Sequence, residues 1–218
     1  MQITIREPGS AITHFIGMMM AIVAATPLMA KAAGDADTDR IALFALAVFI
    51  GSMVALYGAS ALYHSVTVKD SILKVFRKLD HMMIFVLIAG SYTPVCLVIL
   101  GDHRGYTLLA TVWGIAIAGM MIKMCWITCP KWFSSILYIA MGWACLAVFG
   151  TLWDTLSRSA FLWLLAGGIF YTVGGVIYAL KLPIFNSKHK NFGSHEIFHL
   201  FVMGGSICHF IFMYFYVA

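Results

Sequence analysis

The sequence predicts an all-α membrane protein, a bundle of seven transmembrane helices. Of its 218 residues, 62% are hydrophobic and 11% are charged, and the mean hydropathy is +0.93. A soluble domain is about half apolar and about a quarter charged, and it could not hide this much apolar surface from water. The composition therefore excludes a soluble globular protein, a disordered chain and a nucleic-acid-binding protein. It places the chain in the cell membrane, with membrane lipids as its partners.

Seven apolar runs are long enough to cross a bilayer, which takes about 20 helical residues. In lipid, such a run satisfies its own backbone hydrogen bonds by forming a helix. The short breaks between the runs are rich in charge, Gly or Pro, so we expect a single domain over residues 1–218. In chain order, the predicted spans are Ala11–Ala30, Ile41–Tyr63, His81–Leu100, Tyr106–Ile127, Phe133–Leu152, Ala160–Leu180 and His195–Val217.

Lys and Arg are shared unevenly between the two sides of this predicted bundle. Ten lie on the side of the N-terminus and four on the other side. The larger group includes the loop Lys69–Lys78, Lys123 after span four, and Lys181, Lys188 and Lys190 after span six. Because Lys and Arg accumulate in cytoplasmic loops, we expect the N-terminus in the cytoplasm and the C-terminus outside.

Eight histidines are many for so apolar a chain, and ionisable groups at membrane depth usually serve a function. His103 and His189 fall in predicted loops, where water solvates them. His209 lies about 15 Å deeper than His199 at about 1.5 Å per helical residue, and we expect it to link two helices by a hydrogen bond. The histidines expected at the cytoplasmic ends of spans are His14, His64, His81, His195 and His199.

Two of these histidines have the spacing of metal ligands. His195 and His199 are four residues apart, so their imidazoles project from one helix face and can bind one zinc ion. His64 lies at the right depth to be the third ligand, and three histidines with an open position are typical of catalytic zinc. Ser60, four residues before His64, and Asp80 are the candidate catalytic residues: Ser60 hydrogen-bonds near the metal, and Asp80 accepts a proton or positions water.

Several alternatives stand beside this interpretation. Glu196 is a second candidate for the proton acceptor. His14 and His81 are most simply explained as residues wetted by lipid headgroups. Cys125 and Cys129 form a C-x3-C pair near a helix end, an alternative metal site. The five cysteines otherwise read as packing residues of apolar helices and not as a disulfide framework.

Three motifs occur in chain order. An E-x2-N-x3-H motif runs from Glu7 to His14, with Ser10 in place of the usual Asn. An S-x3-H motif with a later Asp is formed by Ser60, His64 and Asp80, and an H-x3-H motif by His195 and His199. With these motifs and seven spans, the chain resembles the hemolysin III family, within the wider progestin and adipoQ receptor (PAQR) superfamily that includes adiponectin receptors.

The resemblance implies a zinc site formed by His64, His195 and His199, with Asp80 and Ser60 nearby, and a cytoplasmic N-terminus. The superfamily is similar to alkaline ceramidases, which implies metal-dependent hydrolysis of a lipid amide. Bacterial members are linked to membrane lipid homeostasis, and their name implies membrane lysis. We therefore expect a zinc-dependent lipid hydrolase first. The alternatives are a cytolytic membrane protein, or a lipid-responsive receptor in which zinc only holds the helices together.

Overall fold

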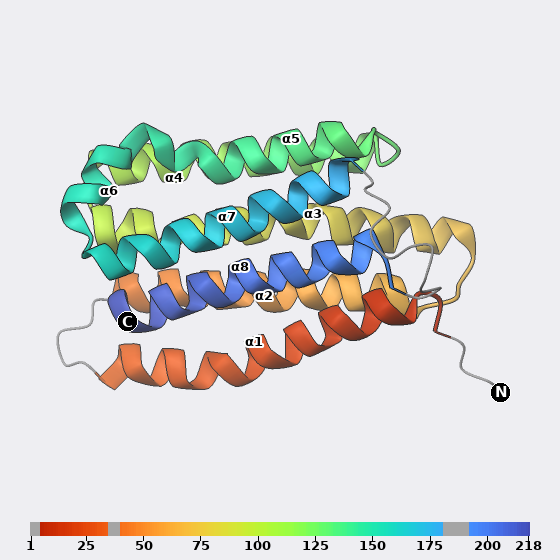
Figure 1. Ribbon diagram of the computed structural model, residues 1–218, viewed down its shortest axis with the longest axis horizontal. Coiled ribbons are helices and arrows are strands. Elements are labelled where there is room, and N and C mark those ends of the chain that lie inside the picture. Colours follow the sequence, from red (N-terminus) through yellow and green to blue (C-terminus); the bar gives the residue numbers. More distant parts are fainter. Residues whose placement is uncertain (1–4, 35–39, 181–191) are drawn as a thin grey trace.

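The computed structural model describes residues 5–34, 40–180 and 192–218, and these residues are almost entirely helical. The helices lie side by side along the long axis of the molecule (Figure 1). Among the described residues, seven helical segments are long and apolar enough to cross a membrane. The all-α class and the number of spans are therefore as predicted. Lys181, Lys188, His189 and Lys190 lie outside the described residues.

The helices begin and end close to the predicted spans. They are α1 (Pro8–Gly34), α2 (Arg40–Ser65), α3 (Asp70–Pro94), the π-helix η1 (Val95–Leu100), α4 (His103–Cys125), α5 (Lys131–Gly142), the 3₁₀-helix η2 (Trp143–Val148), α6 (Phe149–Thr155), α7 (Arg158–Leu180) and α8 (Ser194–Tyr216). Pro94 has no backbone N–H, and the wider π turns follow it directly. Gly101 then ends the segment with a φ of 58°, a left-handed conformation that favours glycine.

Helix α3 is longer than the sequence indicated. We expected a charged loop over Lys69–Lys78 and a span beginning at His81, but the helix begins at Asp70. A helix bonds its own backbone whether or not lipid surrounds it, and apolar residues such as Ile72 and Leu79 recur at helical spacing. With η1 the segment has 31 residues, about 46 Å at about 1.5 Å per residue. Because the hydrocarbon core is about 30 Å thick, this segment is longer than a perpendicular span requires.

Helix α2 lies at the centre of the contacts that position the site. It packs against α1 on one side and α3 on the other, α1 and α7 both pack against α8, and α5 packs against α7. Buried side chains such as Leu46 and Phe49 fill the middle of α2. The end of α2, the first turns of α1 and the beginning of α8 therefore meet at one end of the bundle (Figure 1).

One charge assigned to a loop is buried in the structure. Lys123 lies in the last turns of α4, where its Nζ donates to Cys129 Sγ at 3.1 Å and to Ser134 Oγ. Cys125 is exposed, whereas Cys129 is buried in this contact, so the two thiols of the C-x3-C pair have different surroundings. All five cysteines are free thiols, as expected.

Candidate metal centre

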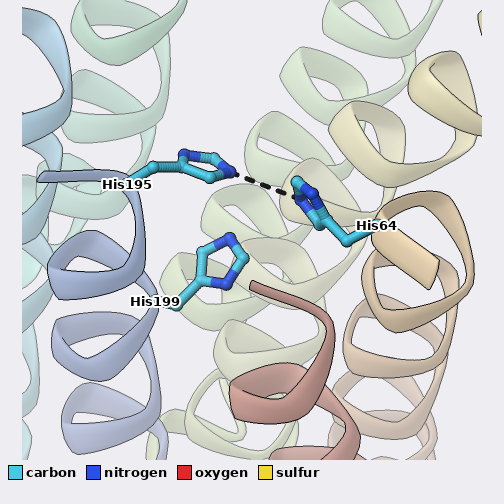
Figure 2. Close-up of side chains that lie close together, drawn as sticks. All are labelled: His64, His195 and His199. Carbon is cyan, nitrogen blue, oxygen red and sulfur yellow. Dashed lines mark hydrogen bonds between the residues drawn. The ribbon is translucent and has the colours of Figure 1, made fainter. Parts of the chain in front are cut away.

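Three histidines from two helices converge at one end of the bundle (Figure 2). His64 lies in the last turn of α2, and His195 and His199 lie on the first two turns of α8. Nε2 of His195 is 3.3 Å from Nε2 of His64, and one nitrogen of each of the three rings lies within 4.8 Å of the others. Two nitrogen ligands of tetrahedral zinc are about 3.3 Å apart, given Zn–N bonds of about 2.0–2.1 Å.

This group could hold a metal ion, and the surrounding side chains support that fit. His64 and His199 are buried. Both nitrogens of His14 and Nδ1 of His195 are buried with no hydrogen-bond partner among the described residues. Leaving a buried polar atom unpaired costs about 1–3 kcal/mol, and an ion, water or substrate bound among these rings would offset that cost. Elsewhere in the described residues, no other group of three or more His, Cys, Asp or Glu comes together in this way.

The beginning of α8 is fixed by Glu196. Its Oε2 accepts a hydrogen bond from the Gly193 N–H at 2.8 Å, in the manner of a helix cap. Its Oε1 accepts a hydrogen bond from Ser10 Oγ on α1 at 2.5 Å. Both carboxylate oxygens are therefore engaged in holding the helix, and this favours a structural role for Glu196 over the role of proton acceptor.

The first residues of α1 contact the histidines directly. Glu7 accepts a hydrogen bond from Nδ1 of His64, and this bond lowers the pKa of the Glu7 carboxyl from its usual value. Thr13 Oγ1 lies 3.2 Å from Nδ1 of His199. The ring of His14 stacks on His199, with centroids 3.6 Å apart and planes 9° from parallel. Figure 2 shows the start of α1, the red-brown ribbon, beside the three rings.

Ser60 and Asp80 face a cavity of about 120 Å³ that His195 and His199 also line. Asp80 is 7% exposed, and its Oδ2 lies 3.5 Å from Nδ1 of His81. Ser60 Oγ has no partner with the full geometry of a hydrogen bond among the described residues, but it lies close enough to the Asp80 carboxylate to interact with it. The arrangement therefore brings a hydroxyl and a carboxylate to the same space as two of the three candidate metal ligands.

Away from the histidines the cavity wall is mostly apolar. The cavity extends between α3, α5, α7 and α8 as far as His209, where a second cavity of about 80 Å³ begins. Ser91, Tyr92, Trp143 and His209 line both spaces. A ligand with a polar head at the histidines and an apolar chain along the bundle would match this distribution of polarity.

The remaining histidines lie in different surroundings. His14 is 3% exposed, so the expectation that headgroups wet it is wrong. His81 lines the cavity and its Nδ1 lies 2.9 Å from the Arg77 carbonyl oxygen. His103 is exposed at the start of α4, as expected for a solvated residue. His209 donates from Nε2 to the Leu164 carbonyl oxygen on α7 at 3.2 Å, which confirms the predicted link between helices.

Sequence reasoning missed the orienting contacts of Glu7 and Thr13. In the sequence, Glu7 is only the first residue of a motif, and its spacing from His14 carries no information about a contact with His64 on another helix. Thr13 had no signal, because a Thr beside a His in an apolar run is ordinary. The packing of α1 against α2 and α8 creates both contacts.

Comparisons with known proteins agree on one family. The family model described as Haemolysin-III related matches residues 2–210. The chain is 38% identical to Hemolysin-3 of Bacillus cereus, over 97% of this chain and 91% of that protein. It is 38% identical to a Hemolysin-3 homolog of Bacillus subtilis (strain 168), over 98% and 95%. It is also 26% identical to an adiponectin receptor protein of Drosophila melanogaster, over 94% of this chain and 49% of that protein.

Proposed function

Because the chain belongs to the haemolysin-III-related family and carries a three-histidine group beside a largely apolar cavity, we propose that it is a zinc-dependent hydrolase of membrane lipids. The proposed substrate class is a lipid amide, and the proposed role is membrane lipid homeostasis. The observation that carries the proposal is that Ser60, Asp80 and two of the three candidate ligands, His195 and His199, line one cavity.

In this proposal, His64, His195 and His199 hold the ion through neutral imidazole nitrogens. When bound, zinc polarises the substrate carbonyl and lowers the pKa of bound water toward about 7. The Asp80 carboxylate accepts a proton from the attacking water and passes it to the amide nitrogen as the C–N bond breaks, so that water and amide become an acid and an amine. The Ser60 hydroxyl, which lies beside Asp80 in the cavity, donates a hydrogen bond to the carbonyl oxygen as negative charge develops there.

The cavity contributes by excluding water and by holding the acyl chain. Its apolar wall continues along the bundle toward His209, so a lipid whose polar head lies at the histidines can place its chain along that wall. We further propose that residues 1–218 act as one domain, with the histidine end toward the cytoplasm. The excess of Lys and Arg at that end supports this orientation. A C-terminal alkaline phosphatase fusion tests it: an active fusion is expected, and an inactive one contradicts it.

The central experiment measures metal and turnover on the same protein. Wild type purified in detergent is expected to contain about one zinc per chain and to hydrolyse a fluorescent ceramide-like amide. His64→Ala should lose both, because it removes a ligand. His103→Ala is the matched control, since His103 is exposed at the far end of the bundle, and it should lose neither.

Two cavity variants separate catalysis from metal binding. Asp80→Asn and Ser60→Ala should keep zinc and lose turnover, by about 10²-fold or more for Asp80 as a proton-transfer group. If wild type carries stoichiometric zinc and hydrolyses no lipid amide, the hydrolase proposal is wrong and the zinc serves a structural role, as in the receptor alternative. If wild type carries no zinc, the metal site is wrong as well.

A second candidate function rests on the name of one relative, Hemolysin-3 of Bacillus cereus. A cytolytic protein would release dye from liposomes or lyse erythrocytes at low protein concentration. Leakage that persists in His64→Ala would favour lysis independent of the metal site. Absence of leakage by active wild type would remove this candidate.

A further inference from the structure

A histidine that binds a metal through one nitrogen needs a partner for the other. The partner fixes the position of the ring proton and the direction of the lone pair, and its loss typically weakens metal binding by about 10–100-fold. His64 has such a partner. Its Nε2 faces His195 at 3.3 Å, while its Nδ1 meets the Glu7 carboxylate. A carboxylate can only accept hydrogen bonds, so Nδ1 of His64 carries the ring proton. Nε2 therefore has a free lone pair directed toward the ion.

The contacts of Thr13 lead to the same conclusion for His199. Thr13 Oγ1 lies 3.0 Å from the carbonyl oxygens of both Gly9 and Ser10, so its one proton is used in the backbone of α1. The hydroxyl can then only accept from Nδ1 of His199, 3.2 Å away. Nδ1 therefore carries the proton of His199, and Nε2 is free to bind the ion.

The segment that supplies these partners, residues 6–14, is itself held by both ligand-bearing helices. Arg6 Nη2 donates a hydrogen bond to the Tyr63 carbonyl oxygen at 2.8 Å. The backbone N–H of Glu7 donates to the His64 carbonyl oxygen at 3.0 Å. These bonds satisfy carbonyl groups that a helix end leaves open. On the other side, Ser10 is bonded to Glu196 at the beginning of α8. The segment thus joins the two helices at the level of the histidines.

From this geometry we infer that residues 6–14 orient the metal ligands, with Glu7 the positioning residue for His64 and Thr13 the positioning residue for His199. The inference rests on the metal site of the proposed function and assigns roles that the hydrolysis scheme does not use. His195, whose Nδ1 has no partner among the described residues, is the ligand that this segment leaves unoriented.

The test is the affinity of purified protein for zinc, measured by competition with a chromophoric chelator. Glu7→Ala should bind zinc about 10–100-fold more weakly than wild type. Glu7→Gln should lie between the two, because an amide oxygen still accepts from Nδ1 but carries no charge. Thr13→Val, which keeps the shape of the side chain, should also weaken binding. Asp70→Asn is the control, since Asp70 is an exposed acidic residue in the first turn of α3, and its affinity should match wild type.

Two further readouts separate orientation from general damage. Visible absorption of Co²⁺ bound in place of zinc should change in Glu7→Ala and return toward the wild-type spectrum in Glu7→Gln. Thermal unfolding of the metal-free proteins identifies a variant that does not fold, and Thr13→Val tests the inference if Glu7→Ala is such a variant. Wild-type zinc affinity and Co²⁺ spectra in folded Glu7→Ala and Thr13→Val would overturn the inference while leaving the metal site intact. Failure of wild type to bind zinc would overturn both.

Discussion

Two buried polar clusters join α2 to α8, and they differ in how their hydrogen bonds are completed. In the hydroxyl cluster (Tyr57, Tyr171 and Ser206), the Tyr57 hydroxyl donates to Ser206 Oγ at 2.6 Å and the Tyr171 hydroxyl lies 2.8 Å from the same oxygen. Every hydroxyl in it has a partner within the protein. Buried polar groups that satisfy one another in this way hold helices together in a membrane.

The histidine cluster (His14, His64, His195 and His199) is equally buried but incomplete. Both nitrogens of His14 and Nδ1 of His195 have no partner among the described residues, and two Nε2 atoms face each other at 3.3 Å. The two clusters touch, since the rings of His14 and Tyr57 meet edge to face at 5.1 Å. The two neighbouring clusters therefore differ in whether their polar atoms are satisfied, and only the histidine cluster offers unpaired ring nitrogens to a ligand.

The largest expected effect is stabilisation of the histidine cluster by metal. Zinc that binds the folded state stabilises it by about 4 kcal/mol at a thousand times its dissociation constant. Thermal unfolding of wild type with and without zinc should show this shift, and a chelator should reverse it. His199→Ala should abolish the shift because two ligands bind far more weakly than three. Tyr57→Phe, in the complete cluster, should keep it in full. An equal shift in His199→Ala would contradict the distinction between the clusters.

A smaller effect is expected from crowding the hydroxyl cluster. A Cβ on Gly205 would lie 2.8 Å from Cε1 and Cζ of Tyr171, so Gly205→Ala must displace the ring whose hydroxyl contacts Ser206. Forcing an extra methyl into a packed interior costs about 1–3 kcal/mol. The unfolding temperature should fall, and zinc affinity should stay at the wild-type value. Gly114→Ala is the control, because a Cβ there meets no atom within 4 Å. A loss of zinc affinity in Gly205→Ala would mean that the clusters are coupled.

The two clusters also differ in how far the sequence predicted them. The H-x3-H spacing of His195 and His199 and the depth of His64 are properties of single helices, and both survive any rearrangement of the bundle. The spans were predicted for the same reason, because length and apolarity act locally. Only the boundaries moved where a helix continued through charged residues, as α3 did from Asp70.

The contacts between helices could not be predicted from the sequence. Tyr57, Tyr171 and Ser206 stand on three helices, and nothing in their spacing relates them. The same holds for Glu7 and Thr13, because their roles depend on how α1 packs against α2 and α8. An interfacial position explains a lone histidine, so the sequence predicts that headgroups wet His14, yet stacking on His199 buries it. Polar contacts between helices can therefore be predicted only when the packing of the helices is known. A pair of ligands on one helix can be predicted from the sequence spacing alone.

The smallest expected effect is the loss of one hydroxyl from the complete cluster. Tyr57→Phe keeps the ring against His14 and removes the bond to Ser206. A buried hydrogen bond contributes about 1 kcal/mol net, and Ser206 keeps its contact with Tyr171. The unfolding temperature should therefore fall slightly, with zinc content and lipid turnover unchanged. A fall in turnover at normal zinc content would give the hydroxyl cluster a part in catalysis, and the division into a structural and a functional cluster would then fail.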